Sequence, residues 1–129
     1  MRLPVMAAAA VATMVTMLTG MAPAGAAEVA ISLSIPVTGS TTVNSNVMAY
    51  GCTDDRAVSA TYINAGEVSL AVLDIAGTTV VASNVVAANG ARYTGGRYVW
   101  WSRGEEADLF DLMDEGGEDL PVAHCTITK

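Results

Sequence analysis

The chain has 129 residues, of which thirteen are acidic and six basic, so its net charge at pH 7 is −7. A protein this acidic is repelled by nucleic acids and anionic membrane surfaces and is attracted to cationic partners. Its length suits one small domain.

The N-terminus has the three parts of an export signal. Arg2 supplies the positive charge, an uncharged run rich in Ala, Val, Met and Thr covers 5–18, and small residues at 24–26 form a cleavage site. The run is too short to span a membrane, which takes about 20 apolar residues. We therefore predict a signal peptide at 1–26 and one domain at 27–129.

The two cysteines, Cys52 and Cys125, are expected to form a disulfide rather than two reduced thiols, because export leads to an oxidising compartment. Closing the long loop between these two cysteines corresponds to roughly 4 kcal/mol of stabilisation in the chain-entropy account. A lipid anchor would need a cysteine directly after the cleavage site, and Cys52 is the first in the chain. We therefore expect a periplasmic or secreted protein without a membrane anchor.

After the predicted leader, apolar residues recur with period two and no long stretch has helical period. Strands are predicted at 29–35, 47–52, 58–63, 68–73, 78–83, 85–88, 97–103, 106–112 and 122–127. About eight short antiparallel strands in a domain of about 100 residues indicate an all-β barrel or sandwich. Periodicity does not choose between the two.

Glycine-containing pairs are predicted to form turns between several of these strands, namely Ala76-Gly77, Asn89-Gly90, Gly95-Gly96 and Gly116-Gly117. Asn-Gly is typical of a type I′ hairpin turn, in which both central residues need positive φ. The segment 37–46 is expected to be a polar loop or a frayed strand, and 111–119 an acidic loop.

The run from Asn89 to Leu109, NGARYTGGRYVWWSRGEEADL, resembles the membrane-bound and periplasmic inhibitors of c-type lysozyme. Asn89-Gly90 and Tyr93 align with a Ser-Gly-x-x-Tyr motif of that family. A second motif, with Tyr, Thr-Lys-Gly and Ala-x-Leu, aligns with the residues Tyr98, Ser102, Arg103, Gly104, Ala107 and Leu109. The segments 50–66 and 69–77 and the late Cys125 also resemble the family.

This resemblance implies an eight-stranded antiparallel barrel that inserts a loop into the active-site cleft of a c-type lysozyme. It implies lysozyme-binding roles for Asn89, Gly90, Tyr93 and Arg103, and it implies a protein that is not an enzyme. Asn89 replaces a Ser that bonds a catalytic carboxylate, and Asn has two N–H donors where Ser has one O–H donor. Arg103 replaces a Lys, and Arg can bind a carboxylate through two parallel N–H bonds.

Simpler interpretations exist for each of these residues. Asn89-Gly90 is also a plain turn, and Arg103 is also an exposed charge at a strand end, paired with Glu105 or Glu106. Tyr93 could pack in the core as well as brace the loop. In a strand, Trp100 and Trp101 face opposite sides, so one is expected to fill the core and the other to lie beside Arg103 or under a loop.

No residue pattern predicts a catalytic, metal or cofactor site. His124, the only histidine, is interpreted as structural, and neither Asp54-Asp55 nor 111–119 has the spacing of an EF-hand loop. The leading alternative to a lysozyme inhibitor is a binding or structural module of the cell envelope that retains the barrel without inhibiting. A secreted hydrolase is a third hypothesis, for which the sequence offers no recognisable nucleophile motif.

Overall fold

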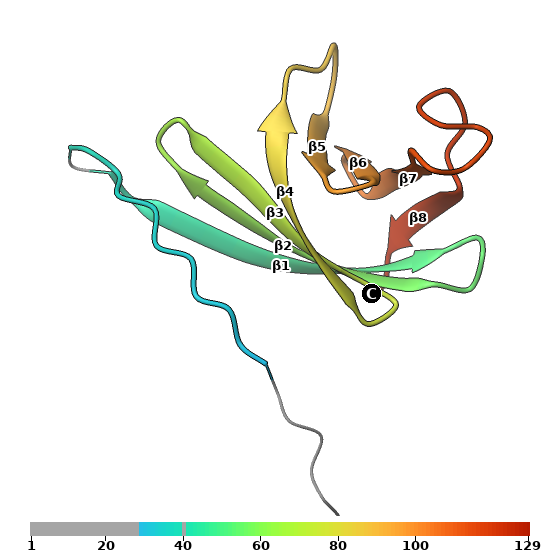
Figure 1. The fold of residues 1–129 in the computed structure, drawn as a ribbon, viewed down its shortest axis with the longest axis horizontal. Coiled ribbons are helices and arrows are strands. Elements are labelled where there is room, and N and C mark those ends of the chain that lie inside the picture. Colours follow the sequence, from blue (N-terminus) through green and yellow to red (C-terminus); the bar gives the residue numbers. More distant parts are fainter. Residues whose placement is uncertain (1–28, 40) are drawn as a thin grey trace, which may run out of the picture. The chain divides into compact units, whose positions relative to one another are not determined.

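A computed structural model describes residues 29–39 and 41–129 (Figure 1). The predicted signal peptide at 1–26 lies outside these residues. The chain divides into one unit that ends at Ser34 and a second, Ile35–Lys129, that contains all the strands. Over the described ranges, no helix has the length and apolarity to cross a membrane.

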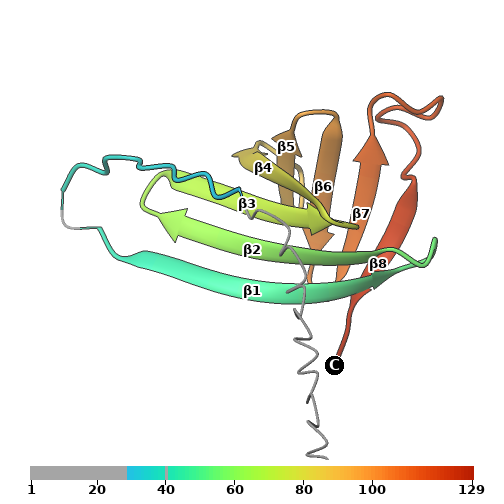
Figure 2. The ribbon, with the colours of Figure 1, turned by 60° about the horizontal axis from the view of Figure 1, so that its bottom comes forward.

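The second unit is a closed barrel in which each strand pairs antiparallel with the next and the last pairs with the first. The strands are β1 (Val43–Cys52), β2 (Ala57–Ala65), β3 (Val68–Ile75), β4 (Thr78–Val85), β5 (Ala91–Gly95), β6 (Tyr98–Arg103), β7 (Glu106–Asp111) and β8 (Ala123–Ile127). Figure 2 shows β1 to β3 as the long, gently curved side of the barrel and β5 to β8 as the shorter strands. The prediction of an all-β fold is confirmed, and of its two forms the barrel is correct.

Three details of the predicted strands are wrong. No strand forms at 29–35, because an alternating pattern becomes a strand only where a neighbouring strand pairs with it. The region 85–88 is not a separate strand, since β4 ends at Val85 and a loop follows. The strand β5 was not predicted, because it has only five residues and lies between two turn signals. In addition β1 begins at Val43, within the segment expected to be a loop or a frayed strand.

The predicted type I′ turn at Asn89-Gly90 is also wrong. Gly90 has φ of 60°, but Asn89 is not among the described residues with positive φ. Five residues, 86–90, connect β4 to β5, so Asn89 lies in a longer loop (the 86–90 loop below). Positive φ at two successive positions occurs at Ala76 and Gly77, where β3 turns into β4.

The barrel interior is filled by side chains from all eight strands, with Trp100 as the largest fully buried one. Its ring meets Tyr50 edge to face, with 5.0 Å between centroids, and its indole N–H donates to the hydroxyl of Tyr62 at 2.8 Å. The Tyr62 hydroxyl also lies 3.0 Å from that of Tyr50. Burial, and then the hydrogen bond with Tyr62, raise the pKa of Tyr50, so this hydroxyl stays neutral in the core.

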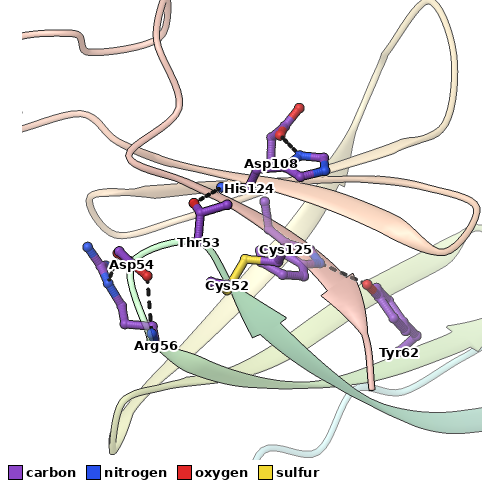
Figure 3. Close-up of a disulfide and its surroundings, with 9 residues drawn as sticks. Cys52, Thr53, Asp54, Arg56, Tyr62, Asp108, His124 and Cys125 are labelled. Atoms are coloured by element: carbon purple, nitrogen blue, oxygen red, sulfur yellow. Dashed lines mark hydrogen bonds and ion pairs between the residues drawn. A yellow bond between two sulfur atoms is a disulfide. The ribbon is translucent and has the colours of Figure 1, made fainter. Parts of the chain in front are cut away.

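The barrel closes where β1 meets β8, and this seam is short. Only three residue pairs join the two strands, and the last of them is Cys52 with Cys125. Their sulfur atoms form a disulfide (Figure 3). Thr128 adds a backbone hydrogen bond to the carbonyl of Ala49. The predicted disulfide is therefore confirmed, and it covalently fixes the seam.

Replacing both Cys52 and Cys125 with Ser is expected to lower the free energy of unfolding. The bridge joins residues 73 apart in sequence, and loss of that constraint on the unfolded chain corresponds to about 4 kcal/mol. Urea unfolding followed by tryptophan fluorescence measures the change, and wild-type protein in reductant should match the double variant. Equal midpoints for the oxidised wild type and the double variant would contradict this role of the disulfide.

Candidate functional site

The 86–90 loop and the end of β6 lie side by side on the barrel. Ala91 at the start of β5 pairs with Ser102 on β6, which places the preceding residue, Gly90, next to Arg103. A Cβ atom on Gly90 would lie 2.3 Å from the carbonyl oxygen of Ser102 and 2.6 Å from Cγ of Arg103. Only glycine fits so close to another strand's backbone at this positive φ. The structure therefore brings together Asn89, Gly90 and Arg103.

Trp101 connects the same two elements. Alternation along β6 places Trp100 in the core and Trp101 on the outer face, as predicted. The Trp101 indole N–H donates to the backbone carbonyl of Asn89 at 2.9 Å. The guanidinium of Arg103 lies over the ring, 5.0 Å from its centroid. One side chain thus contacts both the loop and the cation.

Arg103 also belongs to a polar cluster on the outer face of β6, β7 and β8. Its Nη2 donates to one carboxylate oxygen of Asp108. Nδ1 of His124 lies 2.8 Å from the other oxygen (Figure 3). Asp108 is 9% exposed and is the only buried charged residue in the part of the chain that the structure describes. His124 is further fixed because its backbone N–H donates to the Thr53 hydroxyl at 3.1 Å. The cluster therefore restrains the side chain of Arg103.

Tyr93, the fourth predicted site residue, lies inside the barrel. It is 4% exposed, and its ring centroid is 5.6 Å from that of Tyr62. Of the two interpretations of this residue, core packing describes its position. Because Tyr93 follows the 86–90 loop on β5, its burial anchors the strand that carries the loop.

The remaining arginines near the site have different environments. Arg92, on β5, lies 5.7 Å from the Trp101 ring centroid and 3.6 Å from a carboxylate oxygen of Glu118. Arg97 binds Asp111 through two nitrogens, and these hydrogen bonds lower the pKa of the Asp111 carboxyl. Two of the chain's few cations therefore meet at Trp101, whereas the charge of Arg97 is matched elsewhere.

The interpretation of Arg103 as an ion-pair partner of Glu105 or Glu106 had the right kind of contact but the wrong residue. The partner is Asp108, which the sequence did not single out, and His124 was seen only as structural. The signal available was alternation: Arg103, Trp101, Asp108 and His124 all lie on outer-face positions once the register of β6 to β8 is known. Over the described ranges, no three potential metal ligands gather in one place.

Comparisons with known proteins match the region that contains this site. A family model described as membrane-bound lysozyme-inhibitor of c-type lysozyme matches residues 50–117, more than half of the chain. A Pseudomonas aeruginosa protein named membrane-bound lysozyme inhibitor of C-type lysozyme is 37% identical over 77 residues, which is 59% of this chain and 60% of that protein. The chain thus spans less than two thirds of this relative's length.

A solved structure also matches. The crystal structure of Pseudomonas aeruginosa MliC in complex with hen egg white lysozyme aligns with a TM-score of 0.63 and 31% sequence identity. The alignment covers 78% of this chain and all of that chain.

Asp108→Asn is expected to lower the free energy of unfolding by about 1–3 kcal/mol, because an amide cannot accept from both Arg103 and His124 and leaves a buried polar group poorly paired. Asp119→Asn, on the exposed acidic loop, removes the same charge and serves as the control. Denaturant midpoints measure both. Equal midpoints for the two variants would show that Asp108 does not organise the cluster.

Proposed function

This chain belongs to the family of membrane-bound lysozyme inhibitors of c-type lysozyme, a family of binding proteins rather than enzymes, and we propose that it binds and inhibits a c-type lysozyme. The proposed mode is insertion of the 86–90 loop and Arg103 into the active-site cleft. Support comes from the relative of the same fold whose structure was solved with lysozyme bound.

One observation carries the proposed mode of binding. Asn89 lies in an exposed loop and Arg103 at an exposed strand end, and Gly90, which follows Asn89, packs against the stem of Arg103. The loop that carries the Asn89 amide therefore lies beside the residue that carries the guanidinium. Such a pair suits a cleft that contains carboxylates.

The chemistry of the target explains how such a pair could inhibit. Glycoside hydrolases of this kind cleave their substrate with two carboxyl groups that flank the scissile bond. The Asn89 amide can donate to one carboxyl group, and the Arg103 guanidinium can form charge-assisted hydrogen bonds to the other. A glycan could not then reach either group, and the inhibitor itself would undergo no reaction.

Arg103 can take part without leaving its place on the barrel. Asp108 accepts from Nη2 only, and a guanidinium has further N–H donors on its other nitrogens. The side chain is 39% exposed, so these donors are accessible. A fixed cation loses less side-chain entropy on binding than a free one. The intramolecular ion pair is therefore compatible with binding.

Export is part of the proposal. We place the protein in the periplasm or outside the cell, directed there by the predicted signal peptide at 1–26. Its relatives are named as membrane-bound, whereas both cysteines of this sequence are joined in the disulfide. Neither sulfur is free to carry a lipid, which favours a protein without a lipid anchor on cysteine.

Arg103→Ala is expected to weaken lysozyme binding more than about tenfold, the scale of a lost charge pair at an interface. Calorimetric titration with a c-type lysozyme measures it. Arg103→Lys, which keeps the charge, should retain most of the affinity, and Arg97→Ala, which removes the same charge away from the loop, should retain all of it. If Arg103→Ala binds as tightly as wild type with its fold intact, the guanidinium has no role in the interface.

Substitutions at Asn89 test the loop and separate the inhibitor from the non-inhibitory alternative. Asn89→Asp has the same shape but faces the cleft carboxylates with a like charge, so affinity should fall more than about tenfold. Asn89→Ser should inhibit at least as well as wild type. Inhibition that appears only in Asn89→Ser would support the alternative, a barrel that has lost the inhibitory contact. The readout is the rate of cell lysis by lysozyme.

A further inference from the structure

Trp101 is the residue through which the two parts of the proposed interface contact each other. It lies half-buried on the outer face of β6, opposite Arg92 on β5 and Asp108 on β7. The resemblance to known inhibitors singled out residues on either side of it, and Trp101 itself aligns with a variable position of the second motif. Its contacts nevertheless reach both the loop and the cation.

The first contact fixes the main chain of the loop. The indole N–H donates to the carbonyl of Asn89 at 2.9 Å, and among the described residues this is the only side-chain hydrogen bond to any of the five residues of the 86–90 loop. Residues 88–90, at the loop tip, are exposed, so the barrel wall holds them at few points. The bond holds the residue whose side chain is proposed to enter the cleft.

The second contact fixes the cation. The Arg103 guanidinium stands over the Trp101 ring at 5.0 Å, a cation–π geometry, while Asp108 accepts a hydrogen bond from its Nη2. Ring and carboxylate together hold the guanidinium in place. Gly90 packs against the stem of Arg103, where a Cβ atom would approach Cγ to 2.6 Å. A shift of the ring would therefore move both loop and cation.

We propose that Trp101 is a positioning residue of the lysozyme-binding surface, which sets the relative placement of the Asn89 amide and the Arg103 guanidinium before the partner arrives. The effect of Trp101 on lysozyme binding rests on the proposed function. The physical reason is pre-organisation: groups held in their bound geometry lose less conformational entropy on association. Trp101 need not touch lysozyme for its loss to weaken the complex.

Two substitutions separate the two contacts. Trp101→Phe keeps an aromatic face for Arg103 and removes the N–H that holds Asn89, whereas Trp101→Leu removes both. Tyr98→Phe is the control, because it keeps the ring that packs against the core, and Tyr98 lies on the same strand with its own arginine, Arg97, over its ring at 5.6 Å.

The binding experiment is a double-mutant cycle with Arg103→Ala. We expect Trp101→Phe to weaken lysozyme binding about fivefold and Trp101→Leu about thirtyfold, with fold stability and the Tyr98→Phe control near wild type. In the Arg103→Ala background the effect of Trp101→Phe should persist, because it acts through the loop, and that of Trp101→Leu should shrink to about the same size. Wild-type affinity in both Trp101 variants would overturn the proposal, as would an undiminished effect of Trp101→Leu without Arg103.

A measurement on the free protein decides the positioning role without lysozyme. Amide hydrogen exchange at 87–91 should be several-fold faster in Trp101→Phe than in wild type or Tyr98→Phe, with exchange in β1 and β2 unchanged. Equal exchange in all three proteins would overturn the proposal even if wild type binds lysozyme. Faster exchange in a protein that binds no lysozyme would end the proposed function and leave the positioning of the loop by Trp101 established.

Discussion

The short seam between β1 and β8 is the constraint on which the rest of the barrel depends. It consists of three residue pairs, one of them covalently joined through Cys52 and Cys125. A sheet that closes on itself fixes each strand from two sides and leaves no free edge along the paired stretch. Without closure, β1 and β8 would each pair with one neighbour only. The seam also adjoins the candidate site, because His124 precedes Cys125 and its backbone N–H donates to Thr53, which follows Cys52.

The site concentrates positive charge locally in a protein that is acidic as a whole. With a net charge of −7, most of the surface favours cationic partners and repels acidic ones. Arg92 and Arg103 nevertheless meet at one indole ring, and the second is held by a carboxylate with little exposure. Net charge can thus assist the approach of a partner, while the contact itself depends on a few fixed groups that can match carboxylates inside a cleft.

Much of the fold could be predicted because alternation and turn residues are local signals. Seven of the eight strands and the opposite orientations of Trp100 and Trp101 followed from patterns within short segments. The pairing of the two cysteines followed from the expected export to an oxidising compartment. The predicted strand at 29–35 does not form because no neighbouring strand pairs with it. The strand β5 was missed because five residues between turn signals look like a loop. Asn-Gly at 89–90 lies in a five-residue loop because β4 ends at Val85, which no local pattern revealed.

The site could be predicted only in part, because its contacts depend on register. Resemblance to a known family pointed to Asn89 and Arg103, and the structure places them together. That Arg103 pairs with Asp108, and that Asp108 also holds His124, depends on how three strands align, which a single sequence does not specify. The same holds for Trp101, whose hydrogen bond to the carbonyl of Asn89 joins β6 to the loop that precedes β5.

The most direct test is lysis of bacterial cells by a c-type lysozyme, titrated with purified, oxidised protein that comprises residues 27–129. We expect the rate of lysis to fall in proportion to the added protein and lysis to stop near an equimolar amount, because one barrel occupies one cleft. Undiminished lysis at large molar excess, with the disulfide confirmed by mass, would contradict it and would mean that this barrel binds something else.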